Sequence, residues 1–141
     1  MTKNKLKTSG NKKEREVQLL SLIKKLKSLK KSISKRGEVA PEGCNLIKYK
    51  ISQNKKLYNY YKLQGYEPIF DTLDGKKKTR YRYLGTAGSE AYIEGVMQVT
   101  LRRIIDEIDE MLNSVEDSLL EVMSDTEITE DPSYFSEEDE P

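Results

Sequence analysis

Two apolar repeats, separated by a stretch of different character, most constrain how this chain can fold. The first repeat is spaced alternately by three and four residues and comprises Leu19, Leu22, Leu26, Leu29 and Ile33. The second keeps the same spacing and comprises Leu101, Ile105, Ile108, Leu112, Val115, Leu119 and Val122. Such spacing is typical of helices that pack along a coiled-coil seam. We therefore expect one helix over residues 13–36 and a second over residues 90–124.

The stretch between the repeats has the two-residue period of β-strands. CNLIKYKI (44–51) alternates, LYNYYKLQ (57–64) is rich in aromatic residues, and KKKTRYRYLG (76–85) alternates cations with tyrosines after the turn signal Asp74-Gly75. These segments predict a three-stranded antiparallel sheet over residues 44–85. The expected fold is α+β: an antiparallel, coiled-coil-like helical hairpin with this small sheet inserted between its helices. Residues 13–124 would then form a single α-β-β-β-α domain.

Charge is distributed unevenly along the 141 residues. Residues 1–36 carry a net charge of +11, residues 37–88 carry +5, and residues 89–141 carry −15. Opposite charges favour pairing of the two helices with each other. Residues 1–12 read as a disordered basic arm and residues 125–141 as a disordered acidic tail. The tail either keeps the protein in solution or competes for a basic face.

The composition excludes several classes of site. The chain has no histidine and one cysteine, so it lacks the ligands of a structural zinc site and the imidazole of the common nucleophile-activating arrangements. No phosphate-binding glycine motif occurs, and we expect no enzyme activity, no metal, no cofactor and no small-molecule substrate. No segment is apolar enough for a membrane span or a signal region, so the expected location is the cytoplasm. Cys44 is expected to be a small buried side chain.

The predicted sheet supplies the candidate site. Alternation places the cations of the third strand on one face and Thr79, Tyr81 and Tyr83 on the other, where the two tyrosines would pack against the second helix. The three main strands contain no acid, and cations with interleaved rings suit nucleic acid. The candidate nucleic-acid-binding residues are Lys48, Lys50, Tyr58, Tyr60, Lys62, Lys76, Lys77, Lys78, Arg80 and Arg82. The alternative interpretation is a cationic face that only keeps the sheet solvated and its edges protected.

The segment 57–100 (LYNYYKL…PIF…LDGKKKTRYRYLGTAGSEAYIEGVMQ) resembles the arm-type DNA-binding domain of tyrosine recombinases. That resemblance implies a three-stranded sheet that packs on one helix and inserts into the major groove of DNA. It implies DNA-facing roles for Lys78, Arg80 and Arg82, with Tyr81 and Tyr83 on the packing side. The chain also resembles a small uncharacterised bacterial family in the motifs APEGC, YYKL, PIF, YLG and AGSEAY, which implies no function.

These features predict a non-enzymatic DNA-binding accessory or regulatory protein that contacts duplex DNA through its basic, tyrosine-containing sheet. One alternative is a coiled-coil scaffold for protein interactions, in which the helices are the working surface. A second alternative is an RNA-binding protein that relies more on Tyr58 and Tyr60. The helical repeats could form an intramolecular core or join two chains as a homodimer.

Overall fold

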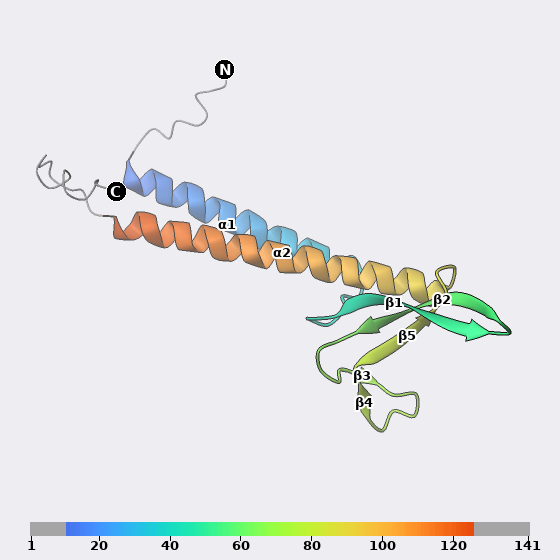
Figure 1. Cartoon of the computed structure of the whole chain (residues 1–141). Coiled ribbons are helices and arrows are strands. Elements are labelled where there is room, and N and C mark those ends of the chain that lie inside the picture. Colours follow the sequence, from blue (N-terminus) through green and yellow to red (C-terminus); the bar gives the residue numbers. More distant parts are fainter. Residues whose placement is uncertain (1–10, 126–141) are drawn as a thin grey trace, which may run out of the picture.

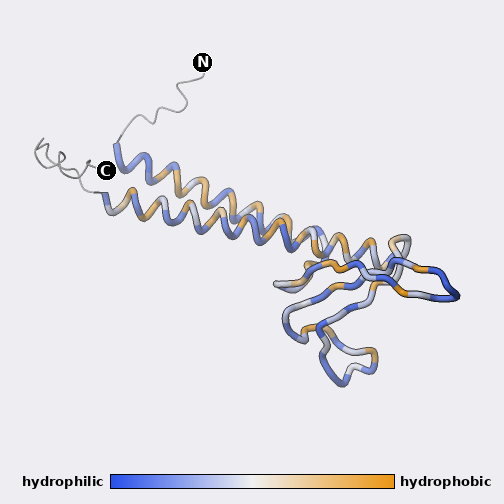
Figure 2. Tube along the Cα trace, viewed as in Figure 1, coloured by the Kyte–Doolittle hydropathy of each residue, from blue (hydrophilic) through white to orange (hydrophobic). Residues whose placement is uncertain are grey.

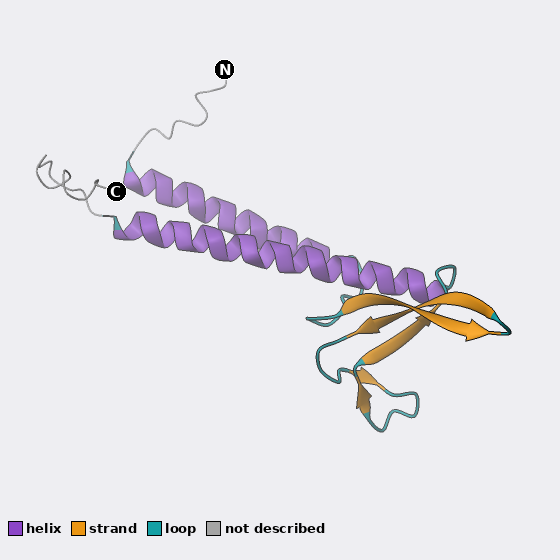
Figure 3. Cartoon of the chain, in the orientation of Figure 1, coloured by secondary structure: helices purple, strands orange, loops and turns teal. Residues whose placement is uncertain are grey.

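The computed structural model describes residues 11–125, and it has the α+β class expected from the sequence. Two helices form an antiparallel hairpin, and a small antiparallel sheet lies between them in the chain and at one end of the hairpin in space (Figure 1, Figure 3). The elements are α1 (Lys12–Ser34), β1 (Asn45–Gln53), β2 (Lys56–Gln64), β3 (Phe70–Asp71), β4 (Lys78–Thr79), β5 (Tyr81–Gly85) and α2 (Glu90–Ser124). The expected basic arm and acidic tail lie almost entirely outside the described residues.

Both helices begin at a polar cap. The side chain of Asn11 accepts a hydrogen bond from the backbone N–H of Glu14 at 3.0 Å, and α1 starts one residue later. Ser89 caps α2, since its Oγ accepts from the N–H of Tyr92 at 3.1 Å. The same hydroxyl donates to the carbonyl of Leu84 at 2.7 Å. This contact ties the start of α2 to the end of β5 and fixes where the helix leaves the sheet.

The two helices pack through a narrow apolar seam. Its buried side chains are Ile23, Ile108 and Leu112, and Leu26, Ile33, Val115 and Leu119 pack beside them. Lys30 Nζ lies 2.8 Å from Asp109 Oδ1, which joins the oppositely charged helices as expected. The expected seam of α1 is wrong in part, because Leu22 and Leu29 are 42% and 48% exposed. Ile23 takes the position facing α2 in their place.

The main sheet has the strand order β1-β2-β5, with every pair antiparallel. A two-residue turn joins β1 to β2, and its residues Asn54 and Lys55 have φ of 49° and 63°. Two successive positive φ values are typical of a type I′ turn, which matches the twist of the strands. The expected continuous strand over 76–85 is divided, because Lys78–Thr79 pairs instead with Phe70–Asp71 in a separate small hairpin.

The sheet is held by the first third of α2. Its core consists of Ala40, Cys44, Leu63, Phe70, Leu84 and Val99, so Cys44 is buried as predicted. A Cβ on Gly95 would come within 2.7 Å of a Leu84 methyl group, so the glycine allows α2 to approach β5 closely. The extra length of α2 relative to α1 therefore covers the sheet. Neither helix in the described range combines the length and apolarity that crossing a bilayer requires.

Candidate nucleic-acid interface

The register assigns each side chain of the main sheet to one of its two faces. Residues paired across antiparallel strands point to the same face. Leu63 pairs with Arg82, and Leu63 belongs to the core that packs on α2. Lys62 pairs with Tyr83 and points to the opposite side, away from α2. We call this second side the open face. Its side chains are Asn45, Ile47, Tyr49, Ile51 and Gln53 on β1, Lys56, Tyr58, Tyr60, Lys62 and Gln64 on β2, and Tyr81 and Tyr83 on β5.

Four tyrosines of the open face form a continuous run of rings. The ring centroid of Tyr49 on β1 lies 6.1 Å from that of Tyr60 on β2 and 6.3 Å from that of Tyr83 on β5. Tyr83 lies in turn 6.2 Å from Tyr81. These distances are within the range of attractive ring contacts. Within the run Tyr83 is 63% exposed, and Tyr58 on the same face is 41% exposed, so both rings are accessible to a ligand.

Lys62 lies among these rings. Its Nζ is 4.3 Å from the ring centroid of Tyr81, 5.2 Å from that of Tyr49 and 5.9 Å from that of Tyr83. Such cation–π contacts hold the tyrosine rings in place, and this structural role alone would account for the position of Lys62. They also place a positive charge at the centre of a face whose three strands carry no acid.

The ring of Tyr49 remains uncharged at neutral pH. Burial raises the pKa of Tyr49, and the neighbouring phenols of Tyr83 and Tyr60 raise it further. A tyrosine that titrates above its usual range presents a neutral hydroxyl and a flat ring. An anionic ligand can therefore lie against Tyr49 without repulsion from a phenolate group.

The expected roles of Arg82 and of Tyr81 and Tyr83 are wrong, because the two sides of β5 are exchanged. Arg82 lies on the helix-facing side, where its guanidinium carbon is 4.8 Å from the Phe70 ring centroid and its Nη1 donates to Gln98 Oε1 at 3.3 Å. The physical reason is the buried Leu84, which shares the side of Arg82 and fills the core.

Cys44 is a member of this core and lies near the Arg82 guanidinium. Burial raises the pKa of the Cys44 thiol, and the nearby positive charge of Arg82 partly offsets that rise. The thiol is therefore a protonated core side chain at neutral pH rather than a reactive group.

The residues predicted to form one cationic face on β1 and β2 also lie on two different sides of the sheet. Lys48 and Lys50 share the side of Leu63 and Arg82, whereas the lysine and tyrosines predicted beside them on β2 point to the open face. Lys50 Nζ donates to Asn59 Oδ1 at 3.1 Å across the hairpin. The ten predicted residues therefore do not form one surface. Tyr58, Tyr60 and Lys62 do share a face, and Tyr49, Tyr81 and Tyr83 join them.

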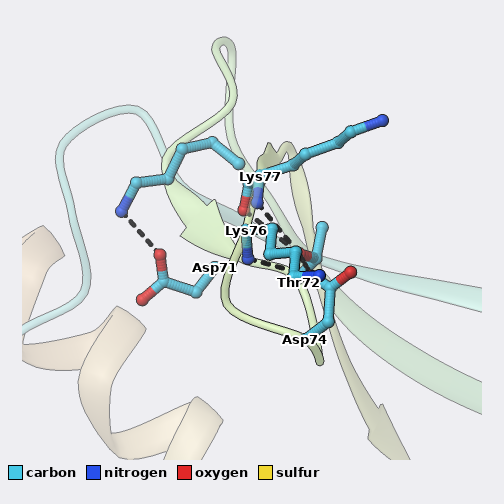
Figure 4. A network of polar contacts seen from close by, with 6 residues as sticks. Asp71, Thr72, Asp74, Lys76 and Lys77 are labelled. Atoms are coloured by element: carbon cyan, nitrogen blue, oxygen red, sulfur yellow. Dashed lines mark hydrogen bonds and ion pairs between the residues drawn. The ribbon is translucent and has the colours of Figure 1, made fainter.

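The loop of the small β3–β4 hairpin is held by its own polar groups (Figure 4). The Thr72 hydroxyl donates to Asp74 Oδ1 at 2.6 Å, and the same oxygen accepts from the N–H of Lys76 at 2.9 Å. The Thr72 N–H donates to the Lys77 carbonyl at 3.0 Å. Hydrogen bonds from Thr72 and from the Lys76 N–H lower the pKa of Asp74. The loop therefore presents the exposed ammonium groups of Lys76 and Lys77 on a defined backbone.

The two remaining predicted cations have partners within the chain. Lys78 Nζ forms an ion pair with Asp71 Oδ1 at 2.7 Å. Arg80 Nε donates to the Gly65 carbonyl at 3.0 Å, and its guanidinium carbon lies 5.8 Å from the Tyr81 ring centroid. Arg80 is therefore positioned at the margin of the tyrosine run, next to β5.

Among residues 11–125 the structure contains no group of three or more His, Cys, Asp or Glu side chains placed to hold a metal ion. Comparison with protein-family models, with curated proteins and with solved structures found no match. The resemblance to the recombinase DNA-binding domain therefore stays a prediction. The functional interpretation depends on the geometry of the open face.

Proposed function

We propose that this protein is a non-enzymatic nucleic-acid-binding protein that holds single strands on the open face of its sheet. The observation that carries the proposal is the run of contacting tyrosine rings from β1 to β5 with Lys62 among them. Every base has a flat π-face, so rings on a sheet accept unstacked bases with little dependence on sequence. The lysine would offset the charge of the phosphates between stacked bases.

Duplex DNA is less well supported as the ligand. A sheet that enters a major groove reads base edges with hydrogen-bonding side chains and holds phosphates with cations. On β5 the side chain expected to do so, Arg82, stacks on Phe70 on the opposite side. On β2 the open face carries Lys62, which lies among the tyrosine rings, and Lys56, which stands at the turn into the strand. Stacking groups rather than groove-reading groups therefore dominate this face.

Cations beside the open face would extend the phosphate contacts. Lys76 and Lys77 are exposed on the small hairpin, and Arg80 lies against the edge of the tyrosine run. A strand whose bases stack on the rings would carry its phosphates toward these groups. Binding should therefore weaken as salt increases, because each neutralised phosphate releases counterions.

The test is fluorescence anisotropy with labelled single strands of about 16 nucleotides, long enough for one small binding surface, at low and moderate salt. The intact protein should bind oligo(dT) and oligo(U) more tightly than a duplex of the same length. Tyr83→Ala should weaken single-strand binding roughly five- to a hundredfold, because each stacked base contributes about 1–3 kcal/mol. Its unfolding midpoint should hardly change, since the ring is mostly exposed.

Tyr66→Ala is the matched control. Tyr66 is 76% exposed, but its ring lies over Gly43, on the side of the sheet that carries the core. This variant should bind like the intact protein. Absence of single-strand binding at low salt, or equal losses in the two variants, would overturn the proposal. If the duplex bound more tightly than the single strand, and Tyr83→Ala did not change its affinity, the duplex-reading alternative would be favoured.

The helices support a second candidate function, that of a coiled-coil scaffold. Its support is the seven-residue spacing of the seam and the exposure of Leu22 and Leu29 beside it. A scaffold would form a stable complex with a specific protein and ignore oligonucleotides. Loss of such a complex in Leu29→Lys, with oligonucleotide binding absent throughout, would favour this function over the first.

A further inference from the structure

Two of the five residues in the apolar repeat of α1 are left uncovered by α2. Leu22 and Leu29 are seven residues apart and therefore lie on the same side of the helix. Both are more than two fifths exposed, although Ile23, the neighbour of Leu22, is buried against α2. Burying a leucine side chain stabilises a fold or a complex. Two exposed leucines on the same side of a helix therefore indicate a surface that a partner could cover.

The second helix repeats this arrangement. Ile104 and Met111 are also seven residues apart, and they are 36% and 47% exposed. Each stands directly before a buried seam residue, Ile105 or Leu112. The apolar stripe of α2 is therefore wider than the surface that α1 covers. Apolar positions recur along both helices in Figure 2.

These four side chains lie on one flank of the helical hairpin. Each precedes by one position a residue that faces the other helix, which corresponds to a rotation of about 100° around its helix axis. In an antiparallel pair, the same rotation on both helices leads to the same flank. We call this surface the apolar flank, and it consists of Leu22, Leu29, Ile104 and Met111.

We infer that the apolar flank is the interface of a homodimer in which two helical hairpins form a four-helix bundle. The charges of the helices identify a second copy of this chain as the occupant. α1 carries eight cations and two acids, a net charge of +6, and α2 carries two cations and nine acids, a net charge of −7. A second copy therefore offers each helix a partner of opposite charge.

The apolar flank also carries charge that is unused within the chain. Lys25 and Glu107 each precede a seam residue, Leu26 or Ile108, by one position, so both lie on this flank. Lys30 pairs with Asp109 across the seam, but Lys25 and Glu107 form no ion pair with any described residue. Long-range attraction to a second acidic helix would steer two chains together and select their relative orientation.

The charges also select between two dimer geometries. A twofold axis parallel to the helices places α1 of one chain over α2 of its partner. An axis perpendicular to the helices, lying in the interface, places α1 over α1 and α2 over α2, which brings like charges together. The first geometry is therefore favoured, and it puts both sheets at the same end of the bundle. If the open face binds nucleic acid as proposed, the dimer then holds two such faces side by side.

Sedimentation equilibrium of the full chain tests the interface. The intact protein should have twice the 16.3 kDa mass of one chain. The double variant Leu29→Lys/Met111→Lys should sediment as a single chain, because its lysines would be buried without partners. Its helical circular dichroism should be unchanged, since both positions are exposed in the isolated hairpin. Single-strand binding is measured separately, so failure of the dimer leaves the proposed function intact.

The control is Leu20→Lys/Leu120→Lys, two equally exposed leucines that follow the seam residues Leu19 and Leu119 by one position. They therefore lie on the opposite flank, and this variant should stay dimeric. A single-chain mass for the intact protein would overturn the inference and point to a different protein as the occupant. A dimer that survives in the flank variant, or dissociates equally in the folded control, would overturn it as well.

A distance measurement tests the orientation. Spin labels on Ser124→Cys, at the exposed end of α2, should lie about 10–20 Å apart across the bundle if the twofold axis is parallel to the helices. The perpendicular axis would instead separate the labels by roughly the length of α1, about 35 Å. A distance of that size would overturn the orientation inferred from charge.

Discussion

The two faces of the main sheet carry similar side chains and use them for different purposes. On the helix-facing side, Tyr61 packs against Tyr92 with ring centroids 4.7 Å apart, and Leu63 beside it is completely buried. On the open face, the preceding residue Tyr60 lies against Tyr49 at 6.1 Å and points away from α2. One strand thus packs into the core on one side and, on the other, presents the ring surfaces that we propose hold nucleic acid.

This difference shows that the presence of tyrosines in a strand does not by itself indicate which of them pack in the core and which are available to a ligand. A tyrosine in a core contributes through burial, and a tyrosine on an accessible face contributes through stacking on what arrives from solvent. Substitutions on the helix-facing side should therefore change the free energy of unfolding. Substitutions on the open face should change affinity with little effect on unfolding.

The largest expected effect is Leu63→Ala. Leu63 has no exposed surface, so removing its side chain should lower the free energy of unfolding by about 2–5 kcal/mol. Urea denaturation followed by circular dichroism measures it. Leu57→Ala, in the same strand but 67% exposed, is the control and should cost less than about 0.5 kcal/mol. The two leucines share one side of β2, so equal losses would mean that α2 does not cover Leu63.

The neighbouring tyrosines Tyr60 and Tyr61 provide the sharpest test of the comparison. Tyr61→Ala should lower the free energy of unfolding by about 2–3 kcal/mol, because a packed aromatic ring is removed, and should spare oligonucleotide affinity. Tyr60→Ala should reduce single-strand affinity by about 1–2 kcal/mol and spare stability. Both quantities can be measured on each variant. The reverse pattern would exchange the functions of the two faces.

Arg82→Ala should have a smaller effect, and on stability alone. It removes the stacking of the guanidinium on Phe70 and the hydrogen bond to Gln98, so a loss of about 1 kcal/mol in unfolding free energy is expected. Arg80→Ala is the comparison, since Arg80 lies beside the tyrosine run. It should weaken binding and reduce the salt slope by about one. If Arg82→Ala weakened nucleic-acid binding and Arg80→Ala did not, the original prediction that Arg82 faces the nucleic acid would be supported.

The smallest expected effect is the pH response of the β3–β4 loop. Hydrogen bonds hold the pKa of Asp74 below its ordinary value of 3.8 in the folded protein. The carboxylate therefore stabilises the loop fully above pH 3.8, and this contribution is lost as the pH falls through the lower folded pKa. The amide shift of Lys76, followed by NMR, should titrate below 3.8. Titration at or above that value would contradict the loop geometry, and Asp74→Asn should abolish the response.

Local periodicity predicted both helices well. The seam of α2, with Ile108 and Leu112 buried, follows directly from the spacing of apolar residues over many turns. Such features depend on residues close together in sequence, and the physical forces that fix them are therefore visible in a single chain.

The faces of the sheet could not be fixed by alternation alone. Alternation shows which residues share a side, but the register decides which side meets the helix. Here the register follows from the two-residue turn at Asn54 and Lys55, which pairs Gln53 with Lys56 and thereby places Leu46 opposite Leu63. Recognising that turn would have indicated the correct side of β1.

Tertiary context decided the rest of the site. Tyr81 and Tyr83 have the apolar rings expected in a core, yet the smaller Leu84 fills the space beneath Gly95. Arg82 has the charge expected in solvent, yet its long side chain stacks on an aromatic ring of a separate hairpin. Long amphipathic side chains can take either environment, so their sequence pattern does not determine their place.

The helical hairpin separates the sheet from the opposite end of the molecule, where α2 ends. Tyr92 packs on the sheet, and Ser124 follows 32 residues later, about 48 Å away along a continuous helix (Figure 1). Residues 126–141 could span about 55 Å at most. Competition by these residues for the open face of their own chain would therefore demand almost full extension, and their deletion should leave single-strand affinity unchanged. If the protein were attached to a solid surface near Ser124, the hairpin would hold the open face away from that surface and leave it accessible to ligands in solution.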